Sequence, residues 1–486
     1  MRGSAAFLGV ALSLGLASSQ AATGPIRIDT EFPRSFRYES GERFFPMGDT
    51  AYFLIAQPTN VIAHYIDVRR AHQFNFIRAM ALAPGFWPFG GSAQKPNYRF
   101  INESILAKWD WIFDYAAARS MNIELILWGY GIQGGEGLWA DASDQQFWIR
   151  TVVNRFKDRP NLFMFTIANE FERYPDGKYR YEPADVDWAR GAAAQIRELA
   201  STVSIGCHPS IWITDQGAAF GRYKEFTQRI PQVVWALWEG SAVTVNITQN
   251  NEGAQPRSWG NLEGGGRGLT YLSTNYDGVA YPAEWTATGW NIDAPALEDS
   301  IAEDWAHGKP ILNAEFGYQF EPGYESEHSV ATRQVHQPAT VRRKAWKIAT
   351  SGGYFAAGFI SAAVRNFSEK DVDNFRPENL QTLYDFFNGK TAYWKLAPRL
   401  DLAASHNVVL AGPGEEYVAY FPRGGTNDLE LFAGDYSVEW LRAGNGRYYS
   451  APALRARAGR HEFTPPESPA EDWVLHLQRR QSKAAQ

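Results

Sequence analysis

The chain has 486 residues, of which 45% are hydrophobic and 21% are charged, so it is too apolar to be disordered and long enough for a barrel-sized domain with a smaller one. Its net charge of -6 argues against a nucleic acid or an anionic membrane surface as a partner. The single cysteine, Cys207, excludes an intrachain disulfide, so packing must hold the fold. The 18 tryptophans suit either a large core or aromatic stacking on sugars.

The first residues have the pattern of an export signal. Met1 and Arg2 precede an apolar run of small residues, Ala5–Ala17, and further small residues lead to Ala22. This pattern predicts a signal peptide over residues 1–22 and a secreted protein, extracellular or periplasmic. The apolar run is short for a bilayer span and no later segment resembles one, so we expect no membrane partner.

After residue 40 the sequence contains eight short, β-prone runs that we predict to be strands. Several are apolar at nearly every position, which is typical of parallel strands buried on both faces. The predicted strands are Phe44–Asp49, Phe74–Met80, Ile123–Gly129, Leu162–Glu170, Ser210–Gly217, Val233–Gly240, Pro310–Gly317 and Tyr354–Ser361.

A segment with helical features follows each predicted strand. The predicted helices are Val61–Gln73, Glu103–Asn122, Asp144–Lys157, Asp185–Ala200, Tyr223–Ile230, Ala294–His307, Thr340–Thr350 and Pro377–Asn388. Eight alternations of strand and helix predict an α/β fold, a (β/α)8 TIM barrel over residues 23–397. We prefer the barrel to an open doubly wound sheet because the chain lacks a Gly-rich phosphate-binding turn.

Two further segments belong to the predicted barrel. Ile26–Arg43 is expected to add a short hairpin at its base. Ser241–Asn291 is rich in Gly, Asn and Trp and is long for a connection, so it either shapes the substrate cleft or forms a surface loop.

The pattern changes near residue 398, where short strand-like runs alternate with Gly-rich turns. Residues 398–486 are therefore predicted to form a small antiparallel β-sandwich domain. Its predicted strands are Val408–Leu410, Tyr417–Phe421, Leu429–Phe432, Ser437–Leu441 and Trp473–Leu477. Bracing of the barrel and glycan binding both remain open as its role, with bracing favoured.

Two glutamates end two predicted strands of the barrel. Glu170 follows Asn169 at the end of the fourth run, and Glu315 lies in Ala-Glu-Phe-Gly at the end of the seventh. Active sites of such barrels lie at the C-terminal ends of the strands, so both carboxylates are expected at one face. Such a pair suits glycosidic hydrolysis, in which one group protonates the leaving oxygen and the other attacks the anomeric carbon.

These motifs resemble those of a known group of barrels. Glu170, with the asparagine before it, and Glu315 look like the acid/base and nucleophile signatures of glycoside hydrolase clan A, and Phe74–Arg78 is similar to that clan's second strand. The opening Phe44–Ala51 resembles the apiosidase-like barrels, which often have a small C-terminal β domain labelled collagen-binding-like. The run Glu416–Trp440 resembles that domain.

The resemblance implies a role for each matching residue. Glu170 would be the general acid/base and Glu315 the nucleophile of a retaining mechanism. Arg78 would lie beside Glu315 and keep it charged. Asn169 would hydrogen-bond the sugar hydroxyl next to the anomeric carbon, and Asp49 would hold outer hydroxyls of the terminal sugar.

Three more residues are candidates for substrate binding. Trp128 and Trp238 end the third and sixth predicted strands and would stack on sugar faces, although packing in the core is an alternative for both. Glu239 follows Trp238 and either binds substrate or is solvated. No spacing of His, Cys or acidic residues fits a metal site, so we predict no metal and no cofactor.

The leading hypothesis is a secreted glycoside hydrolase that cleaves a poly- or oligosaccharide by a retaining double displacement. Two alternatives stay open, a non-catalytic carbohydrate-binding protein and a transglycosylase that uses the same glutamates. The residues also have structural alternatives. Glu170 could form an ion pair with Arg173, Glu315 could pair with Arg78 purely for stability, and Asp49 could be a turn residue.

Overall fold

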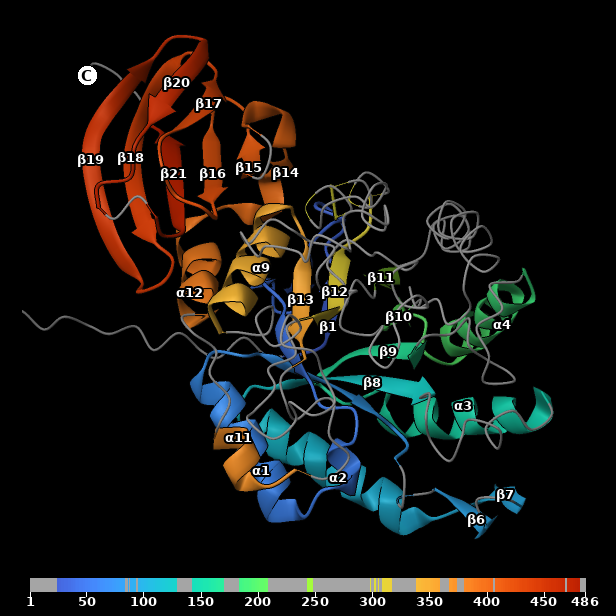
Figure 1. Cartoon of the computed structure of the whole chain (residues 1–486). Coiled ribbons are helices and arrows are strands. Elements are labelled where there is room, and N and C mark those ends of the chain that lie inside the picture. The colour runs from blue at the N-terminus through green and yellow to red at the C-terminus, as the bar shows by residue number, and fades with distance from the viewer. Residues whose placement is uncertain are drawn as a thin grey trace, which may run out of the picture.

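A computed structural model gives the fold of the chain (Figure 1). It describes residues 24–83, 86, 88–92, 95–128, 142–169, 183–208, 243–247, 298, 301–302, 305, 308–316, 338–358, 367–373, 380–404, 407–467 and 470–480. Within these ranges, no helix is both long and apolar enough to cross a membrane.

Eight parallel strands close into a barrel, so the predicted (β/α)8 architecture is confirmed. Around the barrel the strands follow the order β10-β11-β12-β13-β4-β5-β8-β9, and β9 pairs with β10 to complete the circle. Their bounds are β4 Met47–Thr50, β5 Phe76–Met80, β8 Asn122–Trp128, β9 Leu162–Asn169, β10 Ser204–His208, β11 Val243–Ile247, β12 Ile311–Phe316 and β13 Tyr354–Ala357.

The fifth and sixth barrel strands lie elsewhere in the chain than predicted. The fifth, β10, precedes the predicted run Ser210–Gly217, and the sixth, β11, follows the predicted run Val233–Gly240. Both predicted runs fall outside the described residues. Periodicity alone does not show which of several short apolar runs forms a strand. The β-branched residues of Val243–Ile247 favour a strand more than the predicted run Val233–Gly240 does.

Helices cover the outside of the barrel (Figure 1). The described ones are α1 Thr59–Ala71, α2 Glu103–Ala117, α3 Ala142–Phe156, α4 Pro183–Leu199, α9 Pro338–Thr350, α11 Glu369–Asp373 and α12 Leu380–Lys390. In α2 the buried residues include Ile105, Trp109, Ile112 and Ala116, whose spacing of three and four places them on one face of the helix. The Asn102 side chain caps its start by accepting a hydrogen bond from the Ser104 N–H (3.2 Å).

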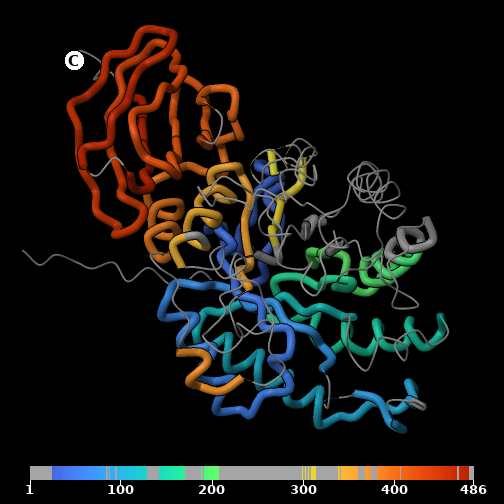
Figure 2. Tube along the Cα trace, viewed as in Figure 1, coloured from blue at the N-terminus to red at the C-terminus, as the bar shows by residue number. Residues whose placement is uncertain are grey.

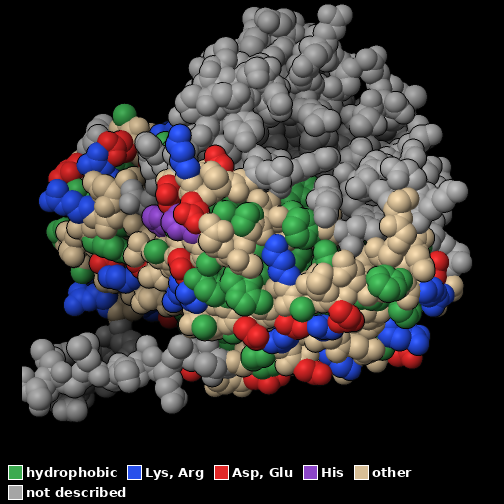
Figure 3. Space-filling view, turned by 90° about the horizontal axis from the view of Figure 1, so that it is seen from below, with side chains coloured by type: hydrophobic (Ala, Val, Ile, Leu, Met, Phe, Trp, Pro, Cys, Tyr) green, Lys and Arg blue, Asp and Glu red, His purple; other side chains and the backbone are tan. Residues whose placement is uncertain are grey.

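The outer surface of this helix layer is charged but not dominated by one sign. Asp110 accepts hydrogen bonds from Arg155 and Arg159 on the neighbouring segment, each at 2.6 Å. Figure 3 likewise shows acidic and basic side chains intermingled on the described part of one face of the molecule. The charges on this part of the surface are therefore paired locally.

Aromatic rings close the N-terminal end of the barrel. The small antiparallel sheet expected at the base is present, with strands β1 Ile26–Ile28, β2 Phe36–Tyr38 and β3 Arg43–Phe44. The rings of Phe36, Phe44 and Phe76 lie edge-on to Phe163, with centroids 5.0 to 5.2 Å away. Gly48 faces this cluster of rings, because a Cβ added to it would lie 2.3 Å from the Phe76 ring. These contacts give the lumen an apolar floor.

The C-terminal region is a β-sandwich domain, as predicted. A six-stranded sheet has the order β14-β15-β16-β21-β18-β19, and β17 and β20 form a second, two-stranded sheet. The bounds are β14 Ala397–Pro398, β15 Val408–Gly412, β16 Glu416–Phe421, β17 Asn427–Leu431, β18 Gly434–Arg442, β19 Arg447–Ala456, β20 Gly459–Phe463 and β21 Trp473–Arg479. The collagen-binding-like label of this domain stays a prediction.

The sandwich packs directly on the barrel helices α9 and α12 (Figures 1 and 2). Trp346 of α9 stacks on Tyr420 of β16, with ring centroids 5.8 Å apart and planes 21° apart. Beside this stack, Arg342 forms a buried ion pair with Asp472 (2.8 Å). A junction of stacked rings and a desolvated ion pair fits the bracing role that was favoured for the domain.

Candidate active site

The strands that lead to the two predicted catalytic glutamates end on the same side of the barrel. Asn169 is the last residue of β9, and Glu170, which follows it, lies outside the described residues. The backbone of Glu315 is placed at the next-to-last position of β12. Because β9 and β12 run parallel within one closed barrel, Asn169 and the backbone of Glu315 both come to its C-terminal end.

Each of these two strands contains a β-bulge just before it ends. On β9, Thr166 and Asn169 pair with residues only two apart on β10, so one extra residue is inserted between them. On β12, Asn313 and Phe316 pair with residues only two apart on β13, and Glu315 lies inside this bulge. Bulges change the direction of a side chain and are frequent beside active sites. Bulges therefore lie just before Asn169 and around Glu315.

Arg78 is the centre of a buried hydrogen-bond network in the lumen. It lies on β5 two residues after Phe76, so it faces the barrel axis above the apolar floor, and it is fully buried. Its Nη2 donates to Asn169 Oδ1 (2.8 Å) and its Nη1 to the Tyr52 hydroxyl (2.9 Å). Its Nε donates to Glu124 Oε1 (3.2 Å). One guanidinium therefore joins three strands or strand ends.

Glu124 is held in place from two directions. It pairs in register with Arg78 across the neighbouring strands β5 and β8, and it is also fully buried. The Thr166 hydroxyl on β9 donates to the same Oε1 atom at 2.6 Å. Met80, Ile126 and Tyr52 form a small apolar cluster at the C-terminal side of this pair. The lumen is thus layered, with an apolar floor, a charged layer and an apolar collar.

The network determines which way the Asn169 amide faces. Oδ1 accepts hydrogen bonds from Arg78 and from the Tyr52 hydroxyl (3.2 Å). Because a guanidinium only donates, the oxygen and not the nitrogen of the amide must face it. The Asn169 NH2 group is consequently turned away from Arg78, which is the orientation that a donor to a sugar hydroxyl needs.

The structure places Asp49 on the outside of the barrel wall. Its neighbour Gly48 faces the Phe76 ring in the lumen, and successive residues of a strand point to opposite faces. The Asp49 carboxylate accepts a hydrogen bond from the Tyr65 hydroxyl (2.8 Å) and forms an ion pair with Arg69, both on helix α1. Burial, together with the Asp49 charge, raises the pKa of Tyr65 well above its usual value. This geometry favours a structural role over the predicted contact with sugar hydroxyls.

The tryptophan candidates receive different support. Trp128 ends β8 on the same strand face as Glu124, but it is 1% exposed and packs against Trp148 at 6.2 Å, so its described contacts are those of a core residue. Trp238 and Glu239 lie outside the described residues. They also precede the sixth strand β11 in the chain, whereas the prediction placed them at its end. Substrate binding by these residues stays a prediction.

Three members of the network were not predicted as site residues, namely Tyr52, Glu124 and Thr166. Glu124 had a usable signal, because it is the one acidic residue in the otherwise apolar run Ile123–Trp128. A lone charge in a strand buried on both faces requires a partner, and Arg78 occupies the equivalent place in the preceding strand. Tyr52 and Thr166 had no comparable signal, since neither is unusual at the end of a strand.

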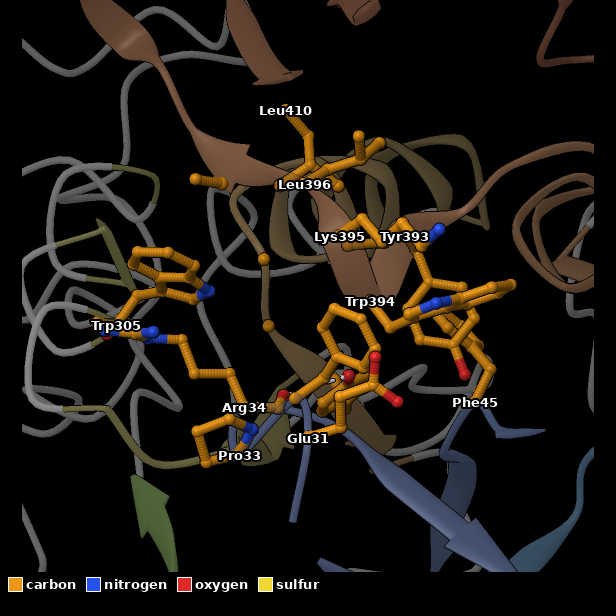
Figure 4. A pocket seen from close by; sticks show the side chains of 16 residues that line it. Glu31, Pro33, Arg34, Phe45, Trp305, Tyr393, Trp394, Lys395, Leu396 and Leu410 are labelled. Atoms are coloured by element: carbon orange, nitrogen blue, oxygen red, sulfur yellow. Dashed lines mark hydrogen bonds between the residues drawn. The ribbon is translucent and has the colours of Figure 1, made fainter. Parts of the chain in front are cut away.

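A cavity of about 230 Å³ lies at the opposite end of the barrel. Phe45, Gly352 and Gly353, which precede barrel strands, line it together with the linker residues Tyr393 and Trp394 (Figure 4). Two of its indole rings are already covered within the protein. The Arg34 guanidinium lies 3.8 Å over Trp305, and the Arg43 guanidinium lies 4.9 Å over Trp394. This cavity is therefore remote from the carboxylates and offers less free ring surface than its aromatic lining suggests.

In the part of the chain that the structure describes, no three His, Cys, Asp or Glu side chains are grouped to hold a metal ion. The Arg78–Glu124 pair combines a cation with its counterion, so the charged layer is not an anionic pocket for a cation.

Comparison with known proteins agrees with the fold. The model of the family described as "Apiosidase-like, catalytic domain" matches residues 31–408. A solved structure described as a glycoside hydrolase is 14% identical, with a TM-score of 0.63 over 94% of this chain and 97% of the other. A glycoside hydrolase family 5 structure from Bacteroides vulgatus ATCC 8482 is 14% identical, with a TM-score of 0.63 over 95% of each chain. At these identities the likeness concerns the fold, which is that of glycoside hydrolases. The chain matches none of the curated proteins.

Proposed function

Since this chain belongs to the apiosidase-like family, we propose that it is a secreted glycoside hydrolase that cleaves a glycosidic bond in a poly- or oligosaccharide with retention of configuration. The observation that carries the proposal is that Asn169 and the backbone of Glu315 lie near the C-terminal ends of two strands of one closed barrel. Asn169, which precedes Glu170 in the chain, ends β9 and accepts a hydrogen bond from the buried Arg78, and the backbone of Glu315 lies in a bulge near the end of β12. The names of the structural neighbours, which are glycoside hydrolases, support the same reaction class.

In the proposed mechanism the two carboxyl groups divide the chemistry. Glu170 donates its proton to the glycosidic oxygen while Glu315 attacks the anomeric carbon, so the C–O bond to the leaving group breaks as the Glu315 ester forms. Glu170, now ionised, takes a proton from water, which attacks the anomeric carbon and releases the sugar from Glu315. Retention requires the two carboxyl groups to lie about 5 to 5.5 Å apart, whereas an inverting enzyme needs about 6.5 to 9.5 Å.

The proposed export is supported by the first 22 residues, with their charged start, apolar run and small residues. An enzyme that acts on polysaccharides meets its substrate outside the cytoplasm, so export and the proposed activity are consistent. Periplasmic fractionation of cells expressing the full chain, with N-terminal sequencing of the product, tests the cleavage expected near Ala22.

The activity is tested with a reducing-end assay on a broad panel of polysaccharides. The proteins compared are the wild type, Glu315→Gly, Glu170→Gln and, as a control at an exposed glutamate of the sandwich domain, Glu467→Gln. We expect Glu315→Gly to abolish turnover and azide to restore it by forming a glycosyl azide, because azide replaces the missing nucleophile. Glu170→Gln should slow the hydrolysis of substrates with poor leaving groups most. The first product, observed by NMR, should keep the configuration of the substrate.

Several results would contradict this mechanism. Turnover of Glu315→Gly that azide does not restore, with no azide adduct, would remove the nucleophile role. Equal losses for all leaving groups in Glu170→Gln would remove the acid role. Binding of a glycan without any turnover by the wild type would favour the carbohydrate-binding alternative, and transfer of sugar to an acceptor other than water would favour a transglycosylase.

A further inference from the structure

In the charged layer of the lumen, Arg78 links the carboxylate of Glu124 to Asn169 and Tyr52, which a purely stabilising ion pair would not need to do. Arg78 uses Nε for Glu124, and its two remaining nitrogens contact Tyr52 and Asn169. A guanidinium is planar and rigid, so fixing Nε on one side fixes the direction of Nη1 and Nη2 on the other. The position of Glu124 therefore determines where the Asn169 amide is held.

Glu124 is itself well suited to set this direction. The strand pairing of β5 with β8 puts it directly opposite Arg78, and the Thr166 hydroxyl holds Oε1 from the next strand. All three side chains are fully buried, so solvent cannot compete for their hydrogen bonds. Three adjacent strands, β5, β8 and β9, thus define one fixed arrangement of a carboxylate, a guanidinium and a hydroxyl.

We propose that Glu124 is a positioning residue of the glycosidase site, which acts through Arg78 to orient the Asn169 amide toward the hydroxyl next to the anomeric carbon. This inference rests on the proposed function. Tyr52 shares the task, because its hydroxyl accepts from Arg78 and donates to Asn169 Oδ1. Neither Glu124 nor Tyr52 was expected to have a part in the site from the sequence.

The proposed role of Glu124 predicts how its substitution changes kcat and KM. A hydrogen bond to the 2-hydroxyl strengthens as charge develops at the anomeric carbon, so misplacement of Asn169 lowers kcat more than it changes KM. Displacements near 1 Å at a reacting site can reduce rates by about 100-fold. A substrate that lacks the 2-hydroxyl cannot use this contact and should be insensitive to Glu124.

The test compares the wild type with Glu124→Gln, Asn169→Ala and the double variant. The substrates are the 4-nitrophenyl glycoside that the wild type hydrolyses fastest, chosen from a panel, and its 2-deoxy analogue. We expect Glu124→Gln to lower kcat by about 10-fold to 100-fold on the first substrate and less than about threefold on the second. In the Asn169→Ala background, Glu124→Gln should have almost no further effect, because both substitutions remove the same contact.

Two controls separate positioning from stability. Thr166→Val keeps the ion pair and removes only the hydroxyl that holds Oε1, so it should give a smaller loss of kcat with the same substrate dependence. Asp472→Asn neutralises a buried arginine-bound carboxylate at the junction of the two domains. It should lower the melting temperature and leave kcat of the folded protein unchanged.

Crystal structures of the wild type and of Glu124→Gln supply a measurement that does not depend on activity. We expect the contact between Arg78 Nη2 and Asn169 Oδ1 to lengthen in the variant, with rotation of the amide. An unmoved Asn169, equal losses on both substrates, or additive losses in the double variant would overturn the proposal. If the wild type hydrolyses no glycoside, the proposed function fails, and the crystal structures still decide whether Glu124 positions Asn169.

Discussion

Two adjacent strands of the barrel each bear a buried pair of an arginine and a carboxylate, and the two pairs face opposite sides of the wall. On β5, Arg78 meets Glu124 in the lumen, while on β4, Asp49 meets Arg69 of helix α1 outside it. All four side chains are fully buried. Burial and ion pairing are therefore the same in both places, and only the side of the sheet differs.

The difference shows how a barrel separates stability from chemistry. The outer pair connects a strand to the helix that covers it, and Tyr65 of the same helix also donates to Asp49. The inner pair extends through Arg78 to Tyr52 and Asn169, next to Glu170. Neighbouring residues of a strand point to opposite faces. A charged side chain moved by one position along the strand would therefore face the covering helix instead of the lumen, or the reverse.

The largest effect that sharpens this comparison is expected from Arg69→Met. The substitution leaves the Asp49 carboxylate buried without its cation, which typically costs about 3 to 5 kcal/mol of stability. Urea denaturation followed by fluorescence should show this loss, while kcat/KM of the folded fraction stays within about threefold of the wild type. A stable Arg69→Met protein whose turnover collapses would return Asp49 to the substrate site.

An intermediate effect is expected from Gly48→Ala, which tests which face of β4 is inside. A Cβ at Gly48 would overlap the Phe76 ring at 2.3 Å, and overpacking of this kind typically costs about 1 to 3 kcal/mol. Thermal denaturation measures the change, with Gly389→Ala as the matched control because a Cβ there meets nothing within 4 Å. If Gly48→Ala were as stable as the control, the assignment of Gly48 to the lumen and of Asp49 to the outside would both fail.

The smallest effect concerns a third arginine–carboxylate group, on the surface. Partial burial alone would raise the pKa of Asp110, but the hydrogen bonds and charges of Arg155 and Arg159 outweigh it and hold the pKa below its usual value of 3.8. Ionised Asp110 therefore adds stability above pH 3.8, and this contribution is lost as the pH falls through the lower, folded pKa.

Asp110→Asn should consequently cost less than about 1 kcal/mol at pH 7, as exposed pairs do, and the difference from the wild type should shrink toward zero in strong acid. Denaturation midpoints measured from pH 7 down to pH 2.5 follow this convergence. A difference that grows as the pH falls would have the wrong sign for a carboxylate with a lowered pKa. Together with Arg69→Met, this variant compares a fully buried charged pair with a partly exposed one.

The barrel could be predicted from the sequence where a strand is a distinct apolar run followed by a regular helix. Leu162–Asn169 and Glu103–Ala117 meet this condition, and both were located to within a few residues. The fifth and sixth strands were misplaced because several short apolar runs lie between residues 204 and 247 and period alone does not rank them. In the sandwich, β19 was missed because this edge strand is mostly exposed and lacks a buried face.

The sequence allowed us to predict that the candidate site lies at the ends of strands, but not which side chains contact one another there. The motif around Asn169 indicated that its amide faces the chemistry, but not that Tyr52 and Arg78 hold its oxygen. Whether Asp49 points into the lumen or out of it depends on the register of β4 and β5. The small size of Gly48 indicates that register only once Phe76 is known to lie beside it. Bulges are equally invisible in a single sequence, because they are a property of two paired strands.

The ring cluster at the barrel base has a kinetic consequence. Four phenylalanines close that end, so we expect a substrate to approach Asn169 from the opposite rim. If the proposed function holds, the substrate, the attacking water and the departing sugar would all pass through that rim. A released sugar that lingers there blocks the next substrate directly, and slowing of the reaction by accumulated product should follow a competitive rate law.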